Sequence, residues 1–351
     1  MTKIISGIQQ LGIGVVDTYN ARDWYKDNLG YDTVIFDEAA EANLMLQYTA
    51  GQPQNRHAIL SYNMKGGGGF EIWQYTDRKP EQPKFDIQLG DLGIFICKIK
   101  APDVGSVYSA FKKNNVNIIS EIKDSPEGKP HFFIKDPYNN IFEIEERNNW
   151  LLNQSKLTGG NSGVTIGVSE MERSVEFYQR ILGYDVVVYD RSGVFTDFTG
   201  LPGGDQKFRR VLLKHSDKRK GAFSPLLGDS TIELVQALSR EPKAIFEDRL
   251  WGDLGYIHLC FDIIGMNQLK NECKEAGYPF TVDSADSFDM GEAAGHFAYI
   301  EDPDGTLIEF VETHKIPILK KLGWYLNLLK RGQKKPLSKL FFKLINSTRK
   351  I

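Results

Sequence analysis

The sequence predicts an α+β fold built from four similar modules that are arranged as two tandem halves. One segment, LGYDTVIFD at residues 29–37, returns as LGYDVVVYD at 182–190. A second segment, GDLGIFICKI at 90–99, returns as GDLGYIHLCF at 252–261. Both halves end with a strand, a turn that begins with Asp-Pro, and another strand. Self-similarity over such long segments indicates duplication of a structural unit.

The first and third modules begin with the order strand, helix, strand. The helical patterns that follow LGIGVV and VTIGVS stop at Gly30 and Gly183, where glycine readily takes the left-handed conformation that ends a helix. In the third module, Ser169 followed by Glu172 predicts a capping box at the helix start. The β-branched residues after each glycine predict the next strand.

The second and fourth modules follow the same plan. After each GDLG segment, apolar residues recur at helical spacing, with Val104 and Val107 in one copy and Leu269 and Cys273 in the other. The turns DPYNN and DPDGT then join two strands, so each module is a βαβββ unit. The expected domains are 1–150, with modules at 5–78 and 88–148, and 158–314, with modules at 160–240 and 252–314, joined by a polar, glycine-rich linker.

The composition fits a folded protein in a reducing compartment. Hydrophobic residues make up 41% of the chain and aromatic residues 12%, which is enough for substantial cores. Cys97, Cys260 and Cys273 form no C-x-x-C pair and are too few for a disulfide framework. The N-terminal segment lacks the apolar region of a secretory signal, and no run of about eighteen apolar residues predicts a membrane span. We therefore expect a cytoplasmic protein.

Residues 315–351 differ from the rest, because they contain eleven Lys and Arg and no Asp or Glu. Apolar residues recur at Leu337, Leu340, Phe341, Leu344 and Ile345. The pattern predicts a basic amphipathic helical tail. Such a tail suits the anionic inner face of a membrane, as a peripheral contact. The alternatives are packing against the acidic body of the chain or against a second subunit, so the protein is expected to be a monomer or a homodimer. Nucleic-acid binding is not expected, since the remaining chain is acidic and has no recognised reading motif.

Through the helix end FY…LGYD and the segment DPDGTLIEF, the chain resembles the vicinal oxygen chelate superfamily. This superfamily includes glyoxalase I, the extradiol dioxygenases, and the fosfomycin and bleomycin resistance proteins. The resemblance covers about residues 5–314 as a four-module fused form. It implies two tandem glyoxalase-like domains, in which pairs of modules form cup-shaped mixed sheets. It also implies that metal ligands project from the first and last strand of each module.

These ligand positions can be counted in all four modules. The first-strand position falls on Gln10, Ile96, Gly163 and His258, and the last-strand position on Glu71, Glu143, Glu233 and Glu309. Only modules 1 and 4 keep a donor at both positions. Fused glyoxalase I pairs its first module with its fourth, so the resemblance implies one site and one lost site. The implied site uses Gln10, Glu71, His258 and Glu309 as ligands of a divalent ion such as Zn, Ni, Fe or Mn.

The implied chemistry is of the lyase or isomerase type. The ion would chelate two neighbouring oxygens of a small organic substrate, and Glu309 or Glu71 would be the proton-transfer base. The identity of the substrate is expected to depend on the insertions at 38–62 and 190–228, which contain no diagnostic motif.

Two other activities stay open. Extradiol dioxygenases pair modules 3 and 4 and hold Fe(II) with two histidines and a glutamate. Here His258 and Glu309 fit, Gly163 replaces the other histidine, and Tyr299 matches a catalytic tyrosine of their signature. Bleomycin resistance proteins instead bind a small molecule without metal or chemistry.

His131 and His296 precede the two Asp-Pro turns at similar places. They are either paired catalytic residues or hairpin residues that were inherited from the duplication.

Overall fold

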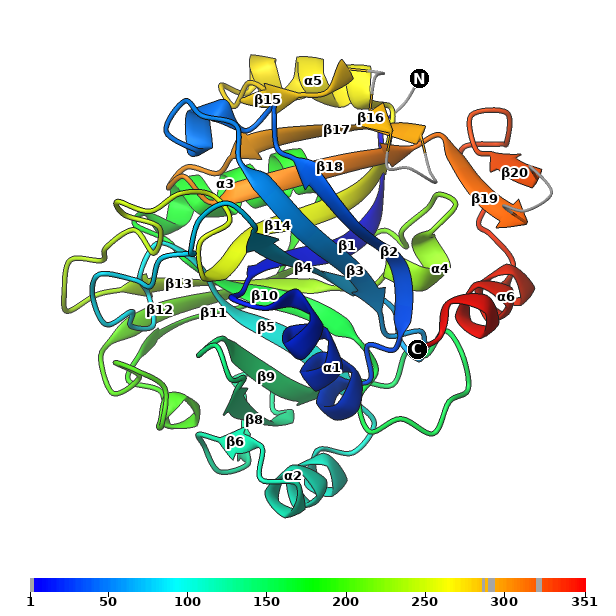
Figure 1. The fold of residues 1–351 in the computed structure, drawn as a ribbon. Helices are drawn as coiled ribbons and strands as arrows, with labels where there is room; N and C mark the ends of the chain where they lie inside the picture. The colour runs from blue at the N-terminus through cyan, green and yellow to red at the C-terminus, as the bar shows by residue number, and fades with distance from the viewer. Residues whose placement is uncertain (1–2, 286–287, 290–293, 320–323) are drawn as a thin grey trace.

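The computed structural model describes residues 3–285, 288–289, 294–319 and 324–351, and within them the predicted α+β class and the four modules are confirmed. Two curved mixed sheets of nine strands each make up the body, and one two-stranded sheet lies beside them (Figure 1). The first sheet contains β1 (Ile4–Gly14), β2 (Thr33–Glu41), β3 (Asn55–Tyr62), β4 (Gly69–Tyr75), β14 (Gly255–Ile264), β15 (Val282–Asp283), β16 (Phe288–Asp289), β17 (Ala294–Glu301) and β18 (Leu307–Thr313).

The second sheet comes from the middle of the chain. It contains β5 (Gly93–Ala101), β6 (Asn117–Ile118), β7 (Lys123–Asp124), β8 (Pro130–Lys135), β9 (Ile141–Glu146), β10 (Asn161–Gly167), β11 (Val186–Gly193), β12 (Phe208–Lys214) and β13 (Thr231–Ala237). The helices are α1 (Thr18–Leu29), α2 (Val104–Lys113), α3 (Met171–Leu182), α4 (Ser224–Leu227), α5 (Met266–Glu275) and α6 (Lys339–Arg349), with short 3-10 helices η1 (Leu46–Tyr48) and η2 (Thr196–Phe198).

The modules pair across the two halves of the chain. Strand β1 of module 1 runs antiparallel to β14 of module 4, and β10 of module 3 pairs antiparallel with β5 of module 2. Within each module the first and last strands are parallel neighbours, as β1 and β4 are. The arrangement with modules 3 and 4 in one cup, which the extradiol alternative requires, is therefore wrong. Each tandem half instead contributes one module to each sheet.

The helices of modules 1 and 3 begin and end by local hydrogen bonding. Gly30 and Gly183 both have φ of 70°, as the helix-end prediction requires. The expected capping box at Ser169 is wrong, because Glu170 is the N-cap and accepts hydrogen bonds from the backbone of Glu172 and Arg173. The hydroxyl of Ser169 instead donates to Asp304, which lies in the Asp-Pro turn of module 4.

Two buried tyrosine–aspartate hydrogen bonds connect the sheets. Tyr25 of α1 donates to Asp136 at 2.6 Å, and Tyr178 of α3 donates to Asp302 at 2.8 Å. In each case the helix belongs to a module of one sheet and the aspartate to the Asp-Pro turn of the next module, which is in the other sheet. Burial raises the pKa of both aspartates to about 6, while these tyrosine hydroxyls and backbone amides favour the charged form. The repeated motifs therefore fix how the sheets pack.

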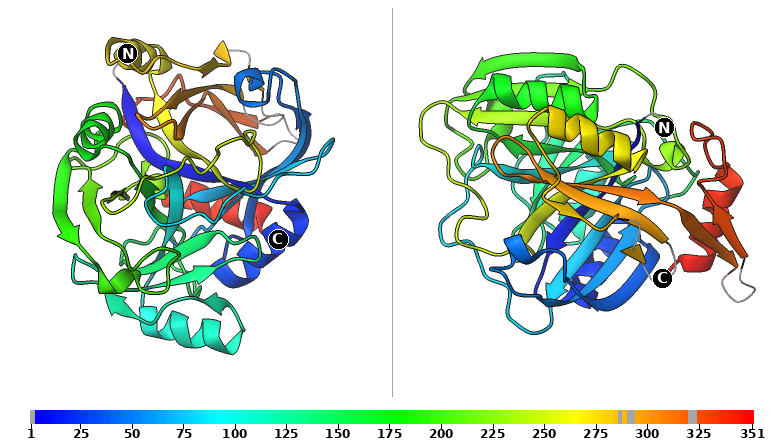
Figure 2. Two further views of the ribbon diagram at one scale, coloured as in Figure 1. Left: turned by 90° about the vertical axis from the view of Figure 1, so that its left-hand side faces the viewer. Right: turned by 90° about the horizontal axis from the view of Figure 1, so that it is seen from above.

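The C-terminal tail is helical only in its last part. As predicted, Lys339–Arg349 form the helix α6, but β19 (Lys315–Leu319) and β20 (Trp324–Asn327) form an antiparallel hairpin where helix was expected. Hairpin and helix lie beside the edge of the first sheet (Figure 2). A helix is disfavoured over this segment because Pro317 has no backbone N–H to donate to the preceding turn.

Helix α6 packs against the protein's own body, which was one of the predicted alternatives. Phe342 is 1% exposed, in a cluster with Leu60 and Leu226. Leu340 and Leu344 are 75% and 40% exposed. Contact of this outer face with an anionic membrane stays a prediction. Among the residues described above, no helix combines the length and apolar character needed to cross a membrane.

We expect Tyr178→Phe to lower the free energy of unfolding by about 1–3 kcal/mol, because the buried Asp302 carboxylate loses a donor. Tyr25→Phe should cost a similar amount, and the two losses should add because the sites are separate. Urea unfolding measures the change. Tyr19→Phe, on an exposed ring, is the matched control and should change stability by less than about 0.5 kcal/mol. If all three variants had the same free energy of unfolding as wild type, the two tyrosine–aspartate hydrogen bonds would not hold the sheets together.

Candidate metal centre

The four predicted donors of modules 1 and 4 converge in the cup of the first sheet. Glu71 on β4, His258 on β14 and Glu309 on β18 each place one ligand atom within 4.8 Å of the others. Nε2 of His258 lies 3.3 Å from Oε2 of Glu71 and 3.1 Å from Oε2 of Glu309. Gln10 on β1 completes the group, since its Nε2 donates to Glu71 at 3.4 Å.

Strand geometry brings these residues together although they are far apart in sequence. The first and last strand of each module are parallel neighbours, and β1 and β14 join the two modules at the centre of the sheet. Gly12 on β1 lies opposite His258, and a Cβ at that position would be 2.4 Å from Cε1 of the imidazole. The ring of His258 therefore needs a glycine across from it.

Several polar atoms of this cluster are buried without a hydrogen-bond partner. Oε1 of Gln10 and Nδ1 of His258 have none, while Nε2 of His258 and Oε2 of Glu309 lie at ion-pair distance from each other but not in hydrogen-bond geometry. Leaving such atoms unsatisfied costs about 1–3 kcal/mol each. A divalent cation bound between the imidazole and carboxylates would satisfy them, and nitrogen and oxygen donors of this kind suit Zn, Ni, Fe and Mn. Rotation of the Gln10 amide by 180° would turn its oxygen toward the same point. The residues therefore fit a metal ion.

The charges of the cluster partly offset one another. Burial would lower the pKa of His258, but Glu309 and Glu71 raise it to about 10. Burial would raise the pKa of Glu71, yet contacts with His258, Arg56 and Gln10 hold that pKa below its usual value. Without an ion, one proton on the imidazole supplies the positive charge. Binding of a metal would replace this proton, because a ligating histidine is neutral.

Tyr299 forms the wall behind His258. It lies on β17 opposite Glu309, is 2% exposed, and its ring centroid is 5.6 Å from that of His258 in an edge-on contact. Burial, with the nearby charges of Glu309 and Glu71, raises the pKa of Tyr299 well above its ordinary value. The structure thus places Tyr299 beside the donors, with a protonated hydroxyl.

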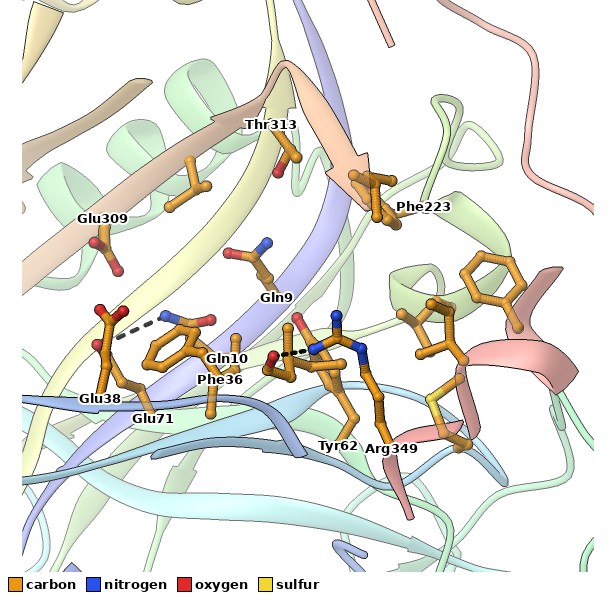
Figure 3. A pocket seen from close by; sticks show the side chains of 18 of the residues that line it. Gln9, Gln10, Phe36, Glu38, Tyr62, Glu71, Phe223, Glu309, Thr313 and Arg349 are labelled. Atoms are coloured by element: carbon orange, nitrogen blue, oxygen red, sulfur yellow. Dashed lines mark hydrogen bonds between the residues drawn. The ribbon is translucent and has the colours of Figure 1, made fainter. Parts of the chain in front are cut away.

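A cavity of about 140 Å³ opens from the donors toward the C-terminal tail. Gln10, Glu71 and Glu309 lie at one end, and Arg349 of α6 lies at the other (Figure 3). Both predicted insertions contribute to the lining, through Arg56 of the first and Phe223 of the second. Sequence reasoning missed the part played by α6. Its apolar residues were visible as a pattern, but a pattern does not show which surface a helix covers.

The corresponding place in the second sheet is filled by a lysine. The glutamates Glu143 and Glu233 come together there as predicted, and the ammonium of Lys98 lies 2.6 Å from the first and 2.8 Å from the second. All three side chains are almost fully buried. Lys98 follows Ile96 by two residues on β5, so it points to the same face. Sequence reasoning missed Lys98, although a charged residue inside the apolar run GIFICKI is the signal that identifies it.

Further buried groups extend this network. Arg210 lies 2.7 Å from both Glu233 and Asp197. Nδ1 of His131 lies 2.7 Å from Glu143. The two inward glutamates thus have protein cations as partners, and the second cup offers no open donor set among these residues.

The expected equivalence of His131 and His296 is wrong. Phe133 pairs with Glu143 in the second sheet, as Tyr299 pairs with Glu309 in the first, so His131 corresponds to Phe297. His296 is one residue out of step and points to the opposite face, because side chains alternate along a strand. Its Nε2 lies 2.6 Å from Asp283. One additional residue before the turn of module 4 causes the difference.

The fold and this site define a class of protein: four fused βαβββ modules in two cups, of which one carries a cluster of converging donors. The model of the Glyoxalase/Bleomycin resistance protein/Dioxygenase superfamily matches residues 7–144 and 162–310. The chain belongs to this superfamily, as its motifs implied.

Solved structures show the same architecture. Glyoxalase I from Zea mays has a TM-score of 0.54 at 15% sequence identity, over 89% of this chain and 92% of that chain. A "putative dioxygenase" from Bacillus subtilis subsp. subtilis str. 168 has a TM-score of 0.56 at 14% identity, over 89% of this chain and 86% of that chain. At such low identity these likenesses establish the fold alone. No curated protein matches the chain in sequence.

We expect Lys98→Met to lower the free energy of unfolding by about 3–5 kcal/mol, because it leaves two buried carboxylates without their shared cation. Lys113→Met, on the exposed face of α2, is the matched control and should change stability by less than about 0.5 kcal/mol. Chemical denaturation measures both. A loss below about 1 kcal/mol for Lys98→Met would show that Arg210 and His131 neutralise the glutamates by themselves.

The His131 contact predicts a pH dependence. Burial would lower the pKa of His131, but Glu143 and Asp197 raise it to about 9, whereas in the unfolded chain it is about 6.5. The stabilisation is therefore fully present below pH of about 6.5 and is lost as pH rises through about 9. We expect wild type to lose on the order of 2 kcal/mol more than His131→Gln between these two pH values. If the curves of unfolding free energy against pH were parallel for wild type and His131→Gln, the stabilising contact of His131 with Glu143 and Asp197 would be contradicted.

Proposed function

We propose that this protein is a metal-dependent enzyme of the lyase or isomerase type, which binds a small organic substrate through two neighbouring oxygens. The proposed ligands are Gln10, Glu71, His258 and Glu309. The observation that carries the proposal is the convergence of these side chains at the end of a cavity, where polar atoms of Gln10, His258 and Glu309 are buried without a hydrogen bond. Buried polar atoms without partners are rare in folded proteins unless a ligand or ion completes them.

The bound ion would act as a Lewis acid on the two substrate oxygens. Acidity of the carbon next to a polarised carbonyl then rises, and a carboxylate within reach can remove its proton. Glu309 suits this role better than Glu71. Both glutamates border the cavity, but Oε2 of Glu309 accepts no hydrogen bond, whereas Oε2 of Glu71 accepts one from Gln10 and its pKa is lowered by the charge of Arg56. We therefore assign Glu71 as a fixed ligand, and Glu309 as a ligand that the substrate would displace from the ion and that would then be the proton-transfer base.

Tyr299 lies opposite Glu309, the proposed base, on the neighbouring strand. Its protonated phenol faces the same cluster. A buried hydroxyl beside a carboxylate restricts the orientation of that carboxylate. Tyr299 is thus proposed as a positioning residue rather than as the group that moves the proton.

The purified protein should bind about one divalent ion per chain, and binding should raise its melting temperature. We expect His258→Gln and Glu71→Gln to weaken metal affinity by at least about tenfold, since each removes a ligand. His215→Gln, on a histidine in the second sheet's insertion, is the control and should retain wild-type affinity. Elemental analysis and calorimetric titration with Zn, Ni, Fe(II) and Mn measure these values.

A metal content below about 0.1 ion per chain, unchanged by His258→Gln and not increased by added metal, would overturn the proposal. The metal-free binding protein, like those of the bleomycin resistance branch, would then be the better interpretation. Calorimetry also distinguishes the base from the fixed ligand, because Glu309→Gln should reduce affinity less than Glu71→Gln does.

A further inference from the structure

The cavity beside the donors changes character along its length. Beyond Gln10, Glu71 and Glu309 its walls are mostly apolar. One wall comes from strands β2 and β3, a second from the segment around α4, and a third from α6. Their main apolar side chains are Phe36, Leu60, Phe223, Leu226, Phe341 and Ile345. A ligand that reaches this part of the cavity would exchange water for hydrocarbon contacts.

Helix α6 is a fixed wall of this cavity. Before the helix begins, the backbone of Leu337 donates to the carbonyl of Ala222 at 2.8 Å. Along the helix, Asn346 accepts from Thr33 at 3.1 Å and from Gln154 at 3.2 Å. Beyond the helix, the backbone of Ile351 donates to the carbonyl of Asp32 at 2.9 Å. These contacts hold both ends of the helix, so its inner face keeps a defined position over the cup.

The charged groups of the apolar part already have partners. Arg56 lies 3.2 Å from Glu38, and the guanidinium of Arg349 donates to the backbone carbonyl of Ile35. Among the described residues that line the cavity, the donors Glu71 and Glu309 are the other charged groups. A charged or strongly polar far end would have to compete with these contacts and lose its hydration among apolar walls, whereas a hydrocarbon would not.

Because the cavity has polar donors at one end and mostly apolar walls beyond them, we propose that the substrate is an amphiphile. Its head carries two neighbouring oxygens and binds at the donor cluster, and its tail is an alkyl or acyl chain that lies between strands β2 and β3 and helix α6. The inference rests on the proposed function for the head, while the tail rests only on the walls of the cavity. Burial of hydrocarbon in such a slot is favourable in proportion to the apolar area that leaves water.

A series of straight-chain alkyl hydroxamates, from two to ten carbons, tests the proposal. The hydroxamate group presents two oxygens on neighbouring atoms to a metal, and the alkyl chain grows toward α6. With the metal-loaded protein, we expect affinity to rise about threefold with each added methylene until the slot is full. Calorimetric titration measures each dissociation constant.

Two variants on opposite faces of α6 provide the control. Ile345→Asn places an amide on the cavity wall and should flatten the dependence of affinity on chain length. Leu340→Asn makes the same kind of change on the side chain that is 75% exposed, and should leave the dependence as in wild type. Both variants should bind acetohydroxamate and metal equally, which shows that they are folded.

The outcomes separate the head from the tail. If acetohydroxamate binds but longer chains bind no better, or if Leu340→Asn flattens the series as much as Ile345→Asn does, the amphiphilic substrate is overturned and the proposed metal site stands. If chelator-treated protein binds decanoic acid and the long hydroxamates as tightly as metal-loaded protein does, the tail site is supported and the metal-dependent function fails. If neither short nor long compounds bind, both proposals fail.

Discussion

The antiparallel pairing of β1 with β14 is the contact on which the rest of the structure depends. It joins the first module to the fourth, although almost the whole chain lies between them. Closing so long a loop costs conformational entropy, but that cost grows only slowly with loop length, and the shared nine-stranded sheet offsets it by burial. Once β1 and β14 are paired, modules 2 and 3 are left to form the second sheet. The pairing also places Gln10 and Glu71 against His258 and Glu309.

The two cups differ in how the charges of their inward-facing glutamates are neutralised. In each cup, two glutamates from the last strands of the two modules face one another. Carboxylates that are removed from water in this way need a positive partner. The second cup has Lys98, whose ammonium lies between Glu143 and Glu233. In the first cup, Cys260 holds the position that corresponds to Lys98, because it pairs with Glu309 as Lys98 pairs with Glu143. An uncharged thiol cannot neutralise the glutamates, so the need for a proton or a cation remains there.

The repeated motifs made the fold predictable, because glycine helix ends, Asp-Pro turns and strand periodicity are local properties. Counting along equivalent strands then reached the donor glutamates and His258. Features that depend on distant contacts were not predictable in this way. Ser169 contacts a turn in another module instead of capping its own helix. One additional residue turned His296 to the opposite face from His131, and strands β19 and β20 formed where a helix was expected.

The C-terminal tail adds a mostly apolar wall to the cavity of the first cup, through side chains of α6. Under the proposed function, donors on the sheet would bind a head group by charge and would select for its oxygens. The inner face of α6 lines another part of the same cavity and would select by apolar area, so the two kinds of selection would be independent. The second cup has no such division, since Lys98 closes its donor end. One face of the basic amphipathic helix α6 thus lines a cavity inside the protein, and its exposed lysines and leucines lie on the other face.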